Sequence, residues 1–270
     1  MQATPPKVAE RITAVLKRFQ PILTSAKARD VNEADTVVIV VDLLAELFGY
    51  DKYSEITREH SIKSTFCDLA LKIDGRLEFL IEVKAIDAEL KDAHVKQAVD
   101  YAANQGVEWV ALTNGVIWRV YRISFAKPID QQLVLDLDLL ALNPKSREHI
   151  ESLHLLTRES ITKSGLLAYH DHKEATSRFF LAAVLLSDTV VETIRRELRR
   201  VSPDIKVSVD EIRQTLTDDV IKRDAVEGPK AELAKKRVAK SAKTMLRIRK
   251  SREEGEAPEE SDPAPAPAEV

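Results

Sequence analysis

The stretch that decides the fold is residues 66–84, FCDLALKIDGRLEFLIEVK. Two apolar runs flank the turn-forming pair Asp74-Gly75, a pattern typical of two antiparallel strands. A two-residue loop at 74–75 would mix charged and apolar side chains on both faces of such a hairpin. A three-residue loop, 74–76, instead places Asp68 opposite Glu82 and separates the two kinds of side chain. We therefore predict the three-residue loop.

The three-residue loop gives the predicted hairpin one apolar face and one charged face, because side chains alternate along a strand. The apolar face, which we expect to be buried, is Cys67, Leu69, Leu71, Ile73, Leu77, Phe79, Ile81 and Val83. The charged face is Asp68, Lys72, Glu78, Glu82 and Lys84. On it, Lys72 would lie opposite Glu78 as an ordinary cross-strand ion pair.

The charged face also predicts a chemistry. Asp68 and Glu82 would repel each other across the ladder unless protonation or a cation compensates their charges. Paired carboxylates suit Mg²⁺ or Mn²⁺, and Val83 is a third candidate metal ligand. Lys84 could orient or deprotonate an attacking water, or neutralise charge on a phosphate. These residue types favour phosphodiester hydrolysis, and the alternative is an exposed strand face with scattered charges.

Patterns on both sides of this hairpin predict an α/β sandwich. A helix over residues 7–19 would end before Pro21, and a second helix over 33–48 would end at Gly49. The dipeptide Asn114-Gly115 predicts a two-residue hairpin turn. Strand patterns cover residues 55–60, 64–73, 77–84, 108–113, 116–123 and 132–135, with a helix over 91–104.

After residue 144 the patterns become helical, over residues 147–157, 174–200 and 209–224. Residues 227–252 hold ten Lys and Arg against two acids, and residues 253–270 hold seven acids and no base. We expect a basic helix that binds nucleic-acid phosphate, followed by a disordered acidic tail. The alternative is a solvated helix that the tail partly neutralises. The candidate phosphate-binding residues are Lys235, Lys236, Arg237, Lys240 and Lys243.

Composition excludes several classes of protein. The chain has 270 residues, 44% of them hydrophobic, which is ample for a packed core. It has no run of 18 or more apolar residues, and its start does not resemble a secretory signal, so we expect no membrane span and a cytoplasmic location. A single cysteine, Cys67, excludes an internal disulfide and a cysteine-based zinc site.

Four short motifs occur in an order that resembles the amino-terminal nuclease domain of type I restriction enzyme R subunits, within the PD-(D/E)XK nucleases. They are Asp68, Glu82-Val83-Lys84, the segment 97–101 (QAVDY) and the segment 112–118 (LTNGVIW). The resemblance covers residues 32–142. It implies a restriction-endonuclease-like core, a mixed sheet flanked by helices, with a C-terminal helical region following it.

The resemblance also implies further site residues. Gln97 and Tyr101 match a Gln-x3-Tyr element that would orient the active site or contact DNA, although both could be ordinary helix-surface residues. A glutamate from the first core helix often joins such centres. Glu33 lies on the stripe facing the sheet and is preferred to Glu46, which points away from it.

This sequence departs from the family in two respects. Cys67 stands where proline is frequent, which leaves the metal-ligand set intact. The chain also lacks a Gly-x4-Gly-Lys-Ser/Thr phosphate loop, so ATP binding and translocation are not predicted.

Four segments follow from these patterns: an N-terminal helix (1–30), a nuclease-like domain (31–143), a helical region (144–226), and a basic helix with an acidic tail (227–270). The expected function is a Mg²⁺-dependent DNA endonuclease linked to restriction or defence. The expected partners are DNA, restriction or defence subunits, and a second copy of the chain if both strands are cut. The alternatives are a non-catalytic nucleic-acid-binding or assembly module, and a structure-specific repair or junction nuclease.

Overall fold

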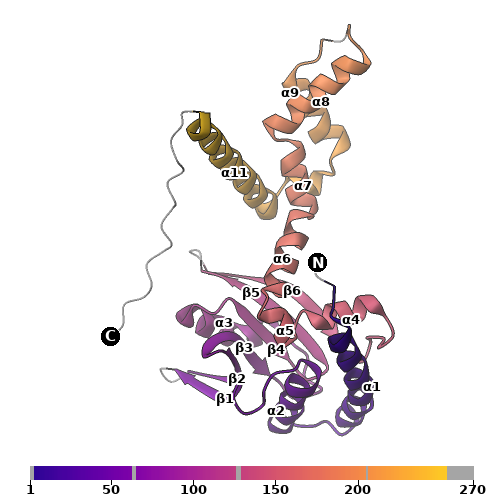
Figure 1. Ribbon diagram of the computed structural model, residues 1–270, viewed down its shortest axis with the longest axis vertical. Helices are drawn as coiled ribbons and strands as arrows, with labels where there is room; N and C mark the ends of the chain where they lie inside the picture. The colour runs from indigo at the N-terminus through magenta and orange to yellow at the C-terminus, as the bar shows by residue number, and fades with distance from the viewer. Residues whose placement is uncertain (1–2, 63–64, 126–128, 205, 254–270) are drawn as a thin grey trace. The chain divides into compact units, whose positions relative to one another are not determined.

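The computed structural model describes residues 3–62, 65–125, 129–204 and 206–253 (Figure 1). Contacts group the chain into two compact units, residues 1–170 and 171–270, a coarser division than the four segments above. The first unit holds a six-stranded mixed sheet with helices, and the second is helical within its described residues. The predicted class, α/β followed by a C-terminal helical region, is therefore confirmed.

The sheet follows the chain order β1-β2-β3-β4-β5-β6. Its strands are β1 (Ile56–Ile62), β2 (Thr65–Ile73), β3 (Arg76–Val83), β4 (Trp109–Thr113), β5 (Ile117–Ser124) and β6 (Asp130–Asp138). Neighbouring strands are antiparallel except β3 and β4, which are parallel. Helix α3 (Asp92–Gln105) makes the crossover that a parallel pair requires.

The hairpin β2–β3 has the predicted register but not the predicted turn. Leu69 pairs with Ile81, and Leu71 pairs with Phe79. The turn is nevertheless the two-residue Asp74-Gly75, because Ile73 pairs with Arg76 and a register shift after Leu71 absorbs the extra residue. The bulge therefore allows a two-residue turn while keeping Leu71 opposite Phe79, the pairing for which we predicted a three-residue loop. Lys72 consequently pairs with Leu77, so the predicted Lys72–Glu78 pairing is wrong.

Both faces of the hairpin are buried, which corrects the expectation of a wholly charged second face. Leu69, Leu71 and Ile81 belong to a core cluster with residues of α1 (Pro6–Ala28) and α2 (Glu33–Asp42). Ala70, Leu80 and Cys67 belong to a second cluster with residues of α3. Asp68, Glu82 and Lys84 therefore form a local charged site at one end of a hairpin whose apolar side chains are buried on both faces.

Two of the first-unit helices differ from their predicted bounds. Helix α1 continues through Pro21 to Ala28, because Leu23 and Ala26 extend its buried stripe into the core. Helix α2 begins as predicted at Glu33 but ends at Asp42, and the π-helical turn η1 (Leu43–Leu47) continues it to Gly49, whose φ is +81°. Helices α4 (Arg147–His154), α5 (Arg158–Ile161) and α6 (Gly165–Ala175) follow the sheet.

The turn between β4 and β5 is longer than the predicted two residues. Strand β4 ends at Thr113, which pairs with Trp118, and β5 begins at Ile117, so residues 114–116 form the loop. The Asn114 Oδ1 atom accepts hydrogen bonds from the backbone N–H groups of Val116 (3.1 Å) and Ile117 (2.8 Å). Asparagine at this position thus stabilises a wider turn through its side chain.

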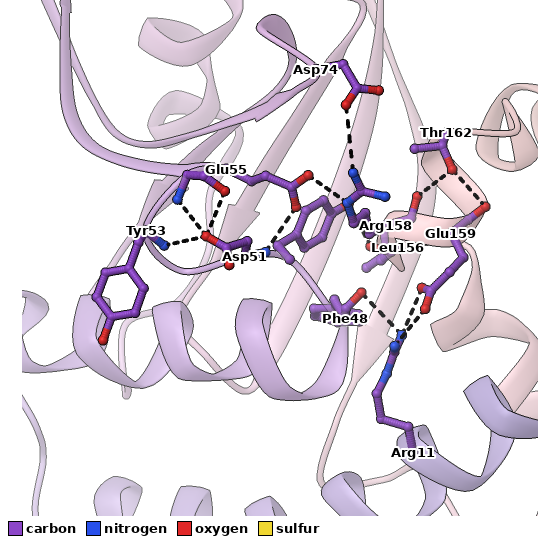
Figure 2. A network of polar contacts seen from close by, with 12 residues as sticks. Arg11, Phe48, Asp51, Tyr53, Glu55, Asp74, Leu156, Arg158, Glu159 and Thr162 are labelled. Carbon is purple, nitrogen blue, oxygen red and sulfur yellow. Dashed lines mark hydrogen bonds and ion pairs between the residues drawn. The ribbon is translucent and has the colours of Figure 1, made fainter.

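A polar network ties α1 and α5 to the turn end of the hairpin (Figure 2). Arg11 donates to both carboxylate oxygens of Glu159 at 2.7 and 2.9 Å. Arg158 Nε donates to Glu55 at 2.6 Å, and its guanidinium lies 4.0 Å from Asp74. These bonds satisfy the buried carboxylate of Glu55 and fix the segment before β1.

The helix predicted over 174–200 is broken in the structure. Helix α7 (Arg178–Leu185) begins after Ser177, whose side chain caps Phe180, and α8 (Asp188–Val201) begins after Ser187. The helix predicted over 209–224 is divided into α9 (Val209–Thr215), η2 (Leu216–Val220) and α10 (Arg223–Val226). The Ser177 hydroxyl accepts from the N–H of Phe180 and so favours a helix start there, whereas the Ser187 hydroxyl donates to the carbonyl of Val184 at the end of α7.

The basic helix is α11 (Pro229–Glu253), as predicted, while the expected disordered tail lies outside the described residues from 254 onward. None of the described helices combines the length and the apolar character that a membrane span requires.

Candidate metal-dependent active site

Asp68 and Glu82 lie on adjacent strands, each one residue beyond the Leu69–Ile81 pair that ends the β2–β3 ladder. The Asp68 Oδ2 atom accepts a hydrogen bond from the backbone N–H of Val83 at 2.7 Å. The Glu82 side chain is only 8% exposed. Strand pairing therefore presents two carboxylates from a rigid part of the sheet.

Lys84 follows β3 directly and completes the group. Its Nζ atom lies 2.7 Å from Glu82 Oε1 and 3.5 Å from Glu33 Oε2. Its backbone N–H donates to the carbonyl of Thr113 at 2.8 Å, which continues the pairing with β4 past the end of β3. The side chain of Lys84 is 21% exposed, so solvent reaches the site from one side.

Glu33 reaches this group from α2. Asn32 caps the helix, since its side chain accepts a hydrogen bond from the N–H of Asp35 at 2.9 Å. The N–H of Ile86 donates to the carbonyl of Val31 at 3.2 Å and holds the start of α2 beside the chain that leaves β3. The alternative glutamate, Glu46, pairs instead with Arg18.

Burial and mutual repulsion set the electrostatics of the site. Burial raises the pKa of Glu82, and the charges of Asp68 and Glu33 act in the same direction against the hydrogen bond from Lys84. Burial alone would lower the pKa of Lys84, but its bond to Glu82 and the charges of the three carboxylates outweigh this and raise the pKa. The ammonium form suits charge neutralisation and hydrogen bonding to water better than proton abstraction.

The donor set fits a hard divalent cation. One ammonium group and three carboxylates leave a formal charge of −2 on the group. Carboxylate oxygens are the ligands that Mg²⁺ and Mn²⁺ prefer, and a dication would offset both the burial of the Glu82 charge and its repulsion by Asp68, which raise the pKa of Glu82. Asp68 and Glu82 would hold the cation. Val83 contributes a backbone N–H to Asp68, which orients that carboxylate.

Gln97 and Tyr101 lie one turn apart on α3, as predicted. Tyr101 is buried in the cluster between α3 and the sheet, where burial raises its pKa and neighbouring Cys67 adds to the effect. The side chain of Gln97 lies outside the described part of the chain. Tyr101 therefore packs between α3 and the sheet that contains β2, the strand that carries Asp68.

The sequence predicts a turn at Asn114 and a strand at Arg119, and neither residue was expected to support the site. Asn114 Nδ2 donates to the carbonyl of Ala88 at 3.1 Å, and Arg119 Nη1 donates to the carbonyl of Leu90 at 2.7 Å. Both bonds hold the chain that follows Lys84. Sequence signals for them are weak, because a turn-forming asparagine and a strand arginine have ordinary explanations.

In the second unit, the predicted phosphate-binding residues of α11 are exposed. Arg237 pairs with Glu174 and stacks on Phe180, and Lys235 lies 2.9 Å from Glu232. The remaining three, Lys236, Lys240 and Lys243, make no ion pair with a described residue. The packed side of the helix is marked by Ala231 and Ala234, which are buried.

No family model matches the chain, and no curated protein or solved structure was found to match it.

Proposed function

We propose that this protein is a Mg²⁺-dependent DNA endonuclease of the PD-(D/E)XK type. The observation that carries the proposal is the convergence of Asp68, Glu82 and Lys84, with Glu33 beside them, at the end of a buried sheet. A bound divalent cation would supply Lewis-acid stabilisation of a phosphodiester group. Lys84 would donate hydrogen bonds to the attacking water or to the charged phosphate.

The remaining groups would support these roles. Val83 would keep the Asp68 carboxylate oriented through its N–H. Glu33, whose Oε2 atom lies 3.5 Å from Lys84 Nζ, would be a second anionic partner for the Lys84 ammonium. Restriction or defence is the proposed setting, with further subunits and a second copy of the chain as proposed partners.

The test of this proposal is cleavage of plasmid DNA in Mg²⁺ or Mn²⁺. We expect the wild type to cut, and Lys84→Ala to lower the rate by about 10²-fold or more, the usual size of one lost electrostatic group. Lys72→Ala is the matched control, since Lys72 lies on the same hairpin at its other end. Equal rates in Lys84→Ala and the wild type, or wild-type inactivity in both metals, would overturn the proposal.

A second candidate function is nucleic-acid binding without cleavage, which the exposed lysines of α11 favour. Counterion release by such side chains gives affinity that falls steeply with salt. We expect Lys236→Ala/Lys240→Ala/Lys243→Ala to weaken DNA binding and to lower the dependence of log Kd on log salt by roughly 3, about one unit per phosphate contact.

Substitution is preferable to deletion of α11, because Ala231 and Ala234 are buried in the second unit. Binding isotherms at several salt concentrations would measure the slope. Lys222→Ala/Lys230→Ala, at exposed positions before and at the start of α11, is the control. An unchanged slope in the triple variant would exclude these lysines from binding.

A further inference from the structure

The eight residues 84–91, which we call the linking segment, carry Lys84 at one end and lead into α3 at the other. They contain no helix or strand. Their conformation depends on bonds to other parts of the first unit. Backbone bonds join Lys84 N–H to the carbonyl of Thr113 and Ile86 N–H to the carbonyl of Val31. Side-chain bonds come from Asn114 to Ala88 and from Arg119 to Leu90.

Asn114 uses the two ends of its amide for two different tasks. Its Oδ1 atom accepts from the N–H groups of Val116 and Ile117 and so forms the β4–β5 turn. Its Nδ2 group donates to the carbonyl of Ala88 at 3.1 Å. The residue is 6% exposed, so water competes poorly for these bonds. The turn and the linking segment are thereby joined through one side chain.

This bond lies close to the candidate site along the chain and in space. Thr113, the residue before Asn114, accepts the backbone bond from Lys84. Ala88 is four residues beyond Lys84, in the middle of the linking segment. Loss of the bond at Ala88 would leave the segment anchored at Lys84, at Ile86 and at Leu90. The span 87–89 would then keep only two exposed ion pairs, Lys27 with Asp87 at 3.7 Å and Lys91 with Glu89 at 3.5 Å.

From this geometry we propose that Asn114 is a positioning residue. Its amide holds the linking segment against the β4–β5 turn and keeps the Lys84 ammonium at hydrogen-bonding distance from Glu82. The inference rests on the proposed nuclease function for its catalytic consequence. Its structural part, that Asn114 fixes residues 84–91, stands on the hydrogen bonds alone.

Asn114→Asp separates the two tasks of the side chain. A carboxylate keeps the acceptor for Val116 and Ile117 but cannot donate to Ala88. Asn104→Asp is the matched control, because Asn104 Nδ2 also donates to a backbone carbonyl, that of Asp100, on the exposed side of α3. Asn114→Ser is a second variant in case the buried carboxylate prevents folding, since a serine hydroxyl also supports such a turn but is too short to reach Ala88.

Three experiments would be done on the full chain. They are backbone hydrogen exchange of residues 84–91, a Mn²⁺ titration that gives Kd, and steady-state DNA cleavage that gives kcat and KM. We expect faster exchange at Lys84 and Ile86 in Asn114→Asp and a kcat lowered about 10–100-fold, the usual effect of removing a group that orients a site residue. KM should stay near the wild-type value, because the DNA contacts are intact. Asn104→Asp should match the wild type in all three.

The outcomes distinguish the two proposals. An inactive wild type overturns the proposed function, and the exchange rates and the Mn²⁺ Kd then decide whether Asn114 organises the segment. An active wild type whose kcat is unchanged in Asn114→Asp overturns the positioning role and leaves the nuclease proposal standing. Unchanged exchange at Lys84 and Ile86 in both Asn114 variants overturns the inference altogether.

Discussion

At the scale of single residues, surroundings decide what one side chain can do. Glu78 and Glu82 lie four residues apart on β3 and are chemically identical. Glu82 is buried beside Asp68, and its pKa is raised by burial and by the neighbouring carboxylates. Glu78 lies at the bulge near the turn, where it is partly exposed. The difference makes Glu82, and not Glu78, a candidate ligand.

His154 is a second residue whose surroundings define its state. Its Nδ1 atom lies 3.0 Å from Thr157 Oγ1. That hydroxyl donates its own proton to the His154 carbonyl at 2.7 Å, so it accepts from the ring. Both contacts are satisfied together when the Nδ1 atom carries a proton. Burial lowers the pKa of His154 below its ordinary value of 6.5.

These groups predict that the first unit loses stability on acidification. Because the folded pKa of His154 is depressed, the unfolded chain binds more protons once the pH falls below about 6.5. For Glu159, the bond and charge of Arg11 outweigh burial and lower the pKa. Its contribution is present above its unfolded pKa, which is 4.5, and disappears as the pH falls through the lower folded pKa.

Tryptophan fluorescence reports on this unit, because Trp109 and Trp118 are both in its sheet. Thermal unfolding should occur at progressively lower temperature between about pH 7.5 and pH 5.5, and His154→Asn should flatten that interval. Glu159→Gln should flatten the interval below about pH 4.5. A pH profile identical in wild type and His154→Asn would exclude the histidine as the cause.

At the scale of elements, tertiary packing overrode one local sequence signal and agreed with others. Pro21 favours a helix end, but α1 continues because Leu23 and Ala26 add buried surface on the same stripe. The starts of α2 at Glu33 and of α9 at Val209 were predicted correctly, and the Asn32 and Ser208 side chains cap them through hydrogen bonds within a single turn.

Gly49 and Gly75 provide a test at this scale, because both have a φ near +80°. A Cβ at Gly75 would meet no atom within 4 Å, whereas a Cβ at Gly49 would lie 2.7 Å from Arg11 Nη1. Gly75→Ala should therefore cost about 1–2 kcal/mol of unfolding free energy from backbone strain alone. Gly49→Ala should cost about 1–3 kcal/mol more unfolding free energy, because the Arg11 guanidinium must move and so weaken its hydrogen bond to Glu159.

Urea unfolding followed by fluorescence would give both free energies. In Arg11→Met, which already lacks the bond to Glu159, Gly49→Ala should cost no more than Gly75→Ala does. A Gly49→Ala variant as stable as Gly75→Ala in the wild-type background would contradict the role assigned to Arg11.

At the scale of the whole molecule, the two units differ in how they are held together. The first unit has two large apolar clusters, one on each face of its sheet. The cluster found among the described residues of the second unit is small, with Ala182, Ala225 and Val226 at its centre. Its helices also expose apolar side chains, among them Val201 and Leu233. Most of the folding energy from apolar burial is therefore in the first unit.

Sequence patterns alone predict where the strands lie, the β2–β3 register at Leu69 and Leu71, and the class of fold. Apolar alternation favours the register that buries one continuous face, and that register predicts Asp68 opposite Glu82. The bulge, the wider turn at Asn114 and the continuation of α1 were decided by tertiary structure. Each depends on partners distant in the chain. The approach of Glu33 to Lys84 and the bond from Asn114 to Ala88 also belong to the tertiary structure, because local patterns specify faces and not which faces meet.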